Sequence, residues 1–293
     1  MSAPASSSPW GTPIPAWPTG ERTQFATVDG YPFAYVEAGA RLPALVLVHG
    51  SMSDLRAFQL QVPALARTAR TFSLSLRHFF PERWDGRGED FSVEQHAEDV
   101  AAFVEARGLN AVHLLGHSRG GAVALQMALR HPRLVRSLIL SDPGGLEALL
   151  PPSAEGEAMA RQSAEMFSRL RDNLASGDAQ AALQRFVEDL NGPGAWERRT
   201  PVQRQMMLDN VTTGPACAQR PAFTPAEIGS LAMPILAMTG ASSPARYRLM
   251  LDAMRALNRN VEDIVTLQGA AHSMHRDAPD AFNAAVRAFV EAH

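Results

Sequence analysis

The sequence predicts an α/β protein with a mostly parallel sheet and helices on both faces. Short apolar runs alternate with segments of helical periodicity along most of the 293 residues, as expected for strands joined by crossover helices. In addition, the apolar run 111–115 passes into a helical segment through Gly116-His117-Ser118-Arg119-Gly120. The glycines of this pentapeptide permit a sharp strand-to-helix turn with the serine at its apex.

The first elements are a hairpin and a buried strand. Residues 23–36 alternate in polarity around Asp29-Gly30, a strong signal for a two-residue turn. The continuous apolar run 44–48 is typical of a strand buried on both faces. A helix over 54–66 and a strand over 71–76 are expected next.

The middle of the core region contains the clearest helix signals. Ser92 and Gln95 form a capping box before a helix over 93–107, and Gly108 is placed to end it. The elements expected after it are a strand over 111–115, a helix over 119–130 and a strand over 136–140.

The alternation stops at Gly145, and residues 145–223 show helical periodicity without a strand. We interpret 145–223 as a helical cap or lid inserted into a core made of 22–144 and 224–293, with 1–21 as a Pro/Ser/Ala-rich N-terminal arm. The alternation then resumes with a strand over 234–239, a helix over 245–257, a strand over 261–267 and a helix over 278–290.

Composition excludes several classes of protein. The net charge is −3, from 27 basic and 30 acidic residues, which argues against nucleic acid or an anionic membrane as the main partner. The single cysteine, Cys217, allows neither an intrachain disulfide nor a cysteine-based metal cluster. The arm lacks the regions of a secretory signal, and no apolar run approaches the ~18 residues of a membrane span. We expect a cytoplasmic protein, and the sequence leaves monomer and homodimer open.

Ser118 is the candidate nucleophile. A serine hydroxyl needs an adjacent base, and that base needs a group to orient it. His272, in the loop after the last expected strand, is the preferred base, and His275 is the alternative.

Two backbone N–H groups are needed to hold a developing oxyanion. We expect the amide of Arg119, directly after the nucleophile, and that of Ser51, in the loop after the strand 44–48. His49 precedes that loop, and bonding the loop backbone is a better interpretation for it than a second base.

A buried strand followed by His49-Gly50, then the Gly116–Gly120 pentapeptide, then a late Gly269-x-x-His272 resembles the α/β-hydrolase family. The resemblance covers about residues 22–293. It implies an eight-stranded mostly parallel sheet, a Ser/acid/His triad, a helical lid and catalysis without a metal or other cofactor.

The acid departs from the usual pattern of that family. The loop 240–244, where the resemblance places a carboxylate, contains none, and Asp252 falls two turns into a helix. Asp142 ends the preceding strand, 24 residues after Ser118, the position used by haloalkane dehalogenases and some lactone hydrolases of this fold. Capping of a turn is the alternative role for Asp142.

With serine rather than aspartate as nucleophile, hydrolysis of a carboxylic ester or lactone is the expected reaction. Carbon–carbon bond hydrolysis, thioester hydrolysis and perhydrolysis use the same triad, and a ligand receptor with little turnover is the alternative of another class. The expected partner is a small-molecule substrate. Candidate pocket residues are Met52, His78, Phe79, His117, Trp196 and Met274.

Overall fold

The computed structural model of the chain describes residues 8–17, 19–219 and 221–293. The expected arm, 1–21, falls partly on residues 1–7 and 18, which lie outside the described residues. Within the described part, the Trp10 ring packs at 6.1 Å from that of Phe25 and 5.8 Å from that of Tyr31. Trp17 is buried in the core. Both tryptophans therefore hold this segment against the body of the protein.

The core is an eight-stranded sheet in the order β1-β2-β4-β3-β5-β6-β7-β8. Antiparallel pairing joins β1 to β2 and β2 to β4, and the other neighbours are parallel. The expected α/β architecture is thus confirmed. The strands are β1 Thr23–Val28, β2 Tyr31–Ala38, β3 Ala44–Val48, β4 Arg70–Leu74, β5 Val112–His117, β6 Val135–Ser141, β7 Ile235–Gly240 and β8 Val265–Leu267.

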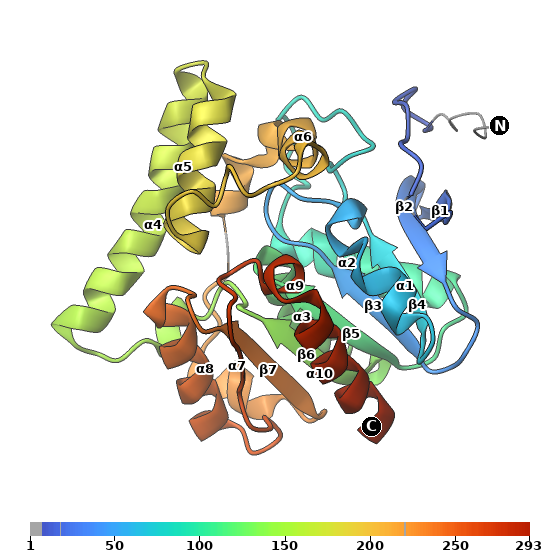
Figure 1. Cartoon of the computed structure of the whole chain (residues 1–293). Helices are drawn as coiled ribbons and strands as arrows, with labels where there is room; N and C mark the ends of the chain where they lie inside the picture. Colours follow the sequence, from blue (N-terminus) through green and yellow to red (C-terminus); the bar gives the residue numbers. More distant parts are fainter. Residues whose placement is uncertain (1–7, 18, 220) are drawn as a thin grey trace.

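Helices cover both faces of this sheet (Figure 1). Along β3, Val46 and Val48 belong to one apolar cluster, and Leu45 and Leu47 to the other. One cluster includes side chains of α2 (Val93–Ala106), α3 (Arg119–Arg130) and α8 (Ala245–Leu257). The opposite cluster includes those of α1 (Gln61–Leu65), α9 (Met274–Asp277) and α10 (Pro279–Ala292).

Between β6 and β7 the chain forms a group of helices, the inserted helices: α4 (Ala154–Ala175), α5 (Ala179–Asn191) and α6 (Pro201–Asp209). Helices α4 and α5 pair side by side, with the rings of Phe167 and Phe186 5.4 Å apart (Figure 1). The side chains of Ser153, Asp178 and Thr200 cap the three N-termini. A short helix, α7 (Pro225–Ser230), leads back to β7.

Two elements differ from the sequence-based expectation. The segment 54–66 forms a 3₁₀ turn, Leu55–Phe58, and the short α1 rather than one helix. Pro63 has no N–H to donate to the preceding turn, so it is tolerated only near the start of a helix. The last strand is also shorter than expected, because Val261 makes only an isolated bridge to Ile235.

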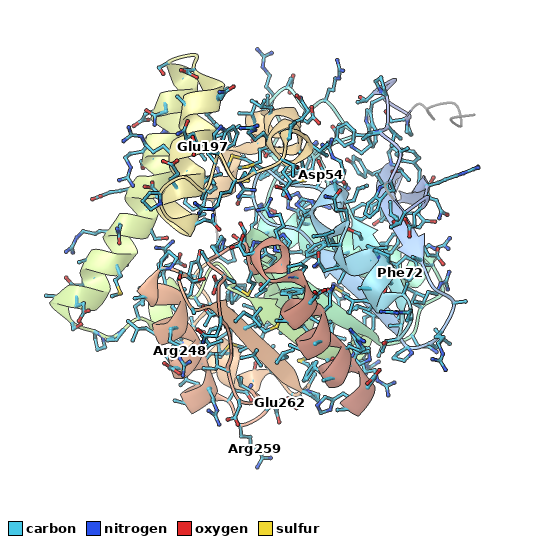
Figure 2. All side chains as sticks on the ribbon, viewed as in Figure 1. Asp54, Phe72, Glu197, Arg248, Arg259 and Glu262 are labelled. Atoms are coloured by element: carbon cyan, nitrogen blue, oxygen red, sulfur yellow. The ribbon has the colours of Figure 1, made fainter. Side chains whose placement is uncertain are left out.

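The inserted helices are anchored to the loop after β3. Asp54, labelled in Figure 2, is fully buried and accepts a 2.7 Å hydrogen bond from Nδ2 of Asn210. Arg56 donates to Asp54 at 2.6 Å and to Asp209, the last residue of α6, at 2.8 Å. Among the described residues, none of the helices has the length and apolar character needed to cross a bilayer.

Candidate active site

Parallel pairing brings four loops to one edge of the sheet. The last residues of the central strands are neighbours: His117 pairs with Ser141, Ser141 with Met238, and Gly240 with Leu267. The loops that follow these strands therefore start side by side. In chain order they carry Ser118, Asp142, Ser243 and His272.

Ser118 lies at the turn between β5 and α3, with φ 54° and ψ −120°. A non-glycine residue in this strained region persists only where its surroundings impose it. A Cβ atom on Gly116 would lie 2.2 Å from the carbonyl oxygen of Gly120, and one on Gly120 would lie 2.2 Å from that of Val48. The two glycines therefore allow helix α3 to start directly against β5 and β3.

Asp142 and His272 are bonded to each other at this edge. The Nδ1 atom of His272 lies 3.1 Å from Oδ2 of Asp142, and both residues are buried, at 3% and 0% exposure. The hydroxyl of Ser243 donates to the same carboxylate oxygen at 2.6 Å. Because a carboxylate only accepts, Nδ1 of His272 carries the proton in this pair, which leaves Nε2 as the basic nitrogen.

Burial is the main influence on the protonation of this pair. It raises the pKa of Asp142 to about 7, an effect opposed by the hydrogen bond from Ser243. Burial and the positive charge of Arg246 hold the pKa of His272 well below its ordinary value. His272 is therefore neutral at pH 7, the form that a general base requires.

Ser118 and His272 line the same cavity. Among the described residues, no hydrogen bond joins the hydroxyl of Ser118 to the imidazole of His272. In unliganded sites such bonds are often long and shorten only when substrate is bound.

The expected oxyanion donors flank Ser118. Ser51 lines the cavity, in the loop after β3, and Arg119 is the first residue of α3. The ring of His49 bonds two backbone groups. Its Nε2 accepts from the Leu76 amide at 3.1 Å, and its Nδ1 lies 2.8 Å from the carbonyl oxygen of Gly50. These bonds give His49 the backbone-holding role that the sequence favoured.

The other candidate acid lies outside the site. Asp252, on α8, is 47% exposed and pairs with Arg248 at 3.0 Å. Arg248 projects from the outer side of α8 in Figure 2. Asp252 is thus oriented toward solvent, as its place in a helix predicted.

His275, the alternative base, lies in the site without an orienting partner. It lines the cavity, and its ring lies 4.6 Å from that of His117. Both of its ring nitrogens are buried with no hydrogen-bond partner. Without a carboxylate to orient it, His275 lacks the arrangement that His272 has.

The cavity around Ser118 is small, about 40 Å³. Of the residues expected in the pocket, Met52 and His117 line it. Other lining residues come from the loop after β3, from the inserted helices and from the segment after His272, and no local sequence signal pointed to them. The missed lining residues are Ser53, Phe186, Leu190, Asn191, Arg199, Met206, Met207, Ser273 and Arg276.

The structure places the other four expected pocket residues outside the lining of this cavity. His78 is held by Glu82 at 3.0 Å and Asp90 at 2.8 Å and stacks on Trp84. Phe79 packs edge-on against His49, 4.6 Å between ring centres. Trp196 and Met274 are buried in the two apolar clusters. Their aromatic and apolar surfaces are used for packing.

Within the described parts of the chain, three or more His, Cys, Asp or Glu side chains are nowhere grouped as a metal site would require.

Comparison with known proteins matches the sequence to one family. Residues 43–200 match the family model described as alpha/beta hydrolase fold. The acetyltransferase component of the acetoin cleaving system of Cupriavidus necator is 29% identical over 57% of this chain and 44% of its own length. Bifunctional epoxide hydrolase 2 of Rattus norvegicus is 28% identical over 59% of this chain and 31% of its own. The chain thus spans less than half the length of either relative.

A solved structure shares the whole fold. Carboxylesterase CesB from Bacillus subtilis superposes with a TM-score of 0.75 at 17% identity, over 94% of both chains. At this identity the likeness concerns the fold alone.

Proposed function

The chain belongs to the alpha/beta hydrolase family, and from that premise we propose that it is a serine hydrolase that cleaves a carboxylic ester or lactone. The observation that carries the proposal is the buried Asp142–His272 pair beside the Ser118 turn. A serine on a strained turn, a neutral imidazole and a carboxylate that orients it are the three parts of a serine hydrolase.

In the proposed reaction His272 Nε2 takes the proton of the Ser118 hydroxyl as its oxygen attacks the substrate carbonyl. The amides of Ser51 and Arg119 hold the oxyanion, and Asp142 stabilises the imidazolium that forms. His272 then gives its proton to the leaving oxygen, and an acyl group stays on Ser118. Water, activated by His272, releases the acid and restores the enzyme.

The identity of the nucleophile distinguishes the proposed activity from epoxide hydrolysis, the activity named for the rat relative. Opening of an epoxide on this fold needs a carboxylate nucleophile that forms an ester with the substrate. Here the residue at the turn is Ser118, which favours acyl transfer.

The inserted helices are proposed to act as a lid. A cavity of about 40 Å³ holds little more than a water molecule, whereas substrate pockets usually measure about 300–1,000 Å³. Part of the wall comes from Phe186 and Leu190 of α5 and Met206 and Met207 of α6. Substrate entry therefore requires these helices to shift from the sheet edge.

The proposal is tested by steady-state hydrolysis of 4-nitrophenyl butanoate. Ser118→Ala and His272→Ala are each expected to lower kcat by about 10⁴-fold or more, and the double variant little further, because triad members act as a unit. His131→Ala, which removes a histidine paired with Glu98 away from the cavity, is the matched control. Near-normal turnover in either triad variant would refute the assignment.

A further inference from the structure

Two arginines line the cavity that holds Ser118. Arg199, between α5 and α6, is only 9% exposed. Its Nη2 lies 3.3 Å from the hydroxyl oxygen of Ser273, while its Nε and Nη1 are buried without a hydrogen-bond partner. Arg276, on α9, donates from Nη2 to the same Ser273 oxygen at 2.7 Å. The two guanidinium groups therefore lie close together at one hydroxyl.

Within the described residues neither arginine has a carboxylate at ion-pair distance. Arg56 provides the comparison in the same molecule: it is buried to the same extent and pairs with both Asp54 and Asp209. The carboxylate next in sequence, Asp277, is exposed and accepts from the Ala271 amide at 3.0 Å. The cavity arginines thus lack the carboxylate partners that Arg56 has.

Two neighbouring guanidinium groups without a carboxylate partner destabilise the folded protein when no ligand is bound. Burial lowers the pKa of Arg199, and the positive charge of Arg276 lowers it further. Burial lowers the pKa of Arg276 to about 10, and the charge of Asp277 opposes both shifts. A guanidinium keeps its proton at neutral pH in proteins. Two like charges at the edge of a cavity, with donors left unused, are typical of a site that gains its partner on binding.

The arginines also separate two cavities. Asn191, Arg199, Ser273 and Arg276 line both the cavity at Ser118 and a larger outer cavity of about 460 Å³. A ligand reaching from the outer cavity toward Ser118 would pass these four residues. Their polar groups therefore lie where one end of a bound substrate would be held.

We propose that Arg199 and Arg276 bind a carboxylate group of the substrate, so that the enzyme selects esters or lactones with an anionic end. The planar fork of a guanidinium matches a carboxylate with two parallel hydrogen bonds. Ser273, which accepts from both arginines, keeps its own hydroxyl proton to donate to the same anion. This inference rests on the proposed serine hydrolase activity and names its substrate class.

The test compares two esters of nearly equal size, mono-4-nitrophenyl glutarate and its neutral methyl diester, followed by release of 4-nitrophenolate. The wild-type protein is expected to prefer the anionic ester by about tenfold or more in kcat/KM. In Arg199→Met and in Arg276→Met that ratio is expected to fall toward one. Arg161→Met removes an exposed arginine of α4 that lines neither cavity and is expected to keep the wild-type ratio.

Stability distinguishes a binding role from a structural one. Since Arg199→Met removes an unpaired buried charge, its Tm is expected to equal or exceed that of the wild type. A structural arginine would give a lower Tm in the variant. Arg276→Met provides the same kinetic readout should Arg199→Met fold poorly.

Binding to Ser118→Ala separates failure of this inference from failure of the proposed function. Calorimetry with glutarate is expected to show binding to Ser118→Ala that is lost when Arg199→Met is added. Turnover of both esters with no anionic preference in the wild type would overturn the carboxylate site and leave the hydrolase intact. Glutarate binding that depends on Arg199, without turnover of either ester, would support the carboxylate site and reject the hydrolase.

Discussion

His272 Nδ1 lies 3.1 Å from Asp142 Oδ2, although the two residues are 130 positions apart in the chain. The sheet explains the contact, since Asp142 follows β6 and His272 follows β8, and only β7 lies between these strands. Ser243, in the loop after β7, donates to the same carboxylate oxygen. Three consecutive sheet-edge loops therefore build one hydrogen-bonded unit.

Asp142→Asn is expected to lower kcat by about 10³–10⁴-fold, because an amide no longer holds His272 in the required tautomer or stabilises the imidazolium. The measurement is steady-state hydrolysis of 4-nitrophenyl butanoate. Asp252→Asn, in an exposed carboxylate paired with Arg248, is expected to keep kcat within about twofold. The reverse ranking would move the acid to α8.

The pH dependence of kcat/KM follows from the buried pair. Activity requires ionised Asp142, whose pKa is raised to about 7 by burial, so we expect kcat/KM to fall as the pH drops below about 7. The pair titrates as a unit, so the midpoint belongs to both groups. A profile that stays flat down to pH 5 would contradict this description of the carboxylate.

The fall of kcat/KM at low pH is the acid limb of the profile. Ser243→Ala is expected to move this limb to higher pH by about one unit. The hydroxyl donates to the charged form of Asp142, so its loss disfavours ionisation and raises the pKa further. Ser242→Ala changes the neighbouring exposed serine and should leave the limb in place. An unchanged or lower midpoint in Ser243→Ala would show that the hydroxyl does not stabilise the carboxylate.

Gly120→Ala is expected to destabilise the fold by about 3 kcal/mol, because the added methyl would lie 2.2 Å from the carbonyl oxygen of Val48. Gly229→Ala is the matched control, since its nearest neighbour would be 3.6 Å away on the exposed side of α7. That change should stabilise the protein by about 0.5–1 kcal/mol. Urea unfolding of both variants measures the difference, and equal stabilities would refute the close approach of α3 to β3.

Much of the fold could be predicted because its signals are local. The apolar run 44–48 and the helix 119–130 have the predicted bounds in the structure. The expected positions of Ser118, Asp142 and His272 at strand ends follow from the same local signals, and the structure brings Asp142 and His272 together. Their catalytic roles stay predictions.

The pocket could not be predicted in the same way. Arg199 stands beside exposed Arg198 in the sequence, and nothing local distinguishes the buried guanidinium from the solvated one. His78 follows a strand, as an active-site residue often does. Its ring is bonded to Glu82 and Asp90 instead of lining the cavity. Which side chain reaches the cavity depends on how the inserted helices pack over the sheet edge, a long-range feature.

The most direct test of an activated Ser118 is the mass of the intact protein after exposure to a fluorophosphonate, with Ser118→Ala as the control. This reagent reports a nucleophilic serine without knowledge of the substrate. The proposed function predicts one stoichiometric adduct on the wild-type protein and none on Ser118→Ala. A folded wild-type protein that stays unlabelled, or a variant labelled equally, would contradict the assignment of Ser118 as the nucleophile.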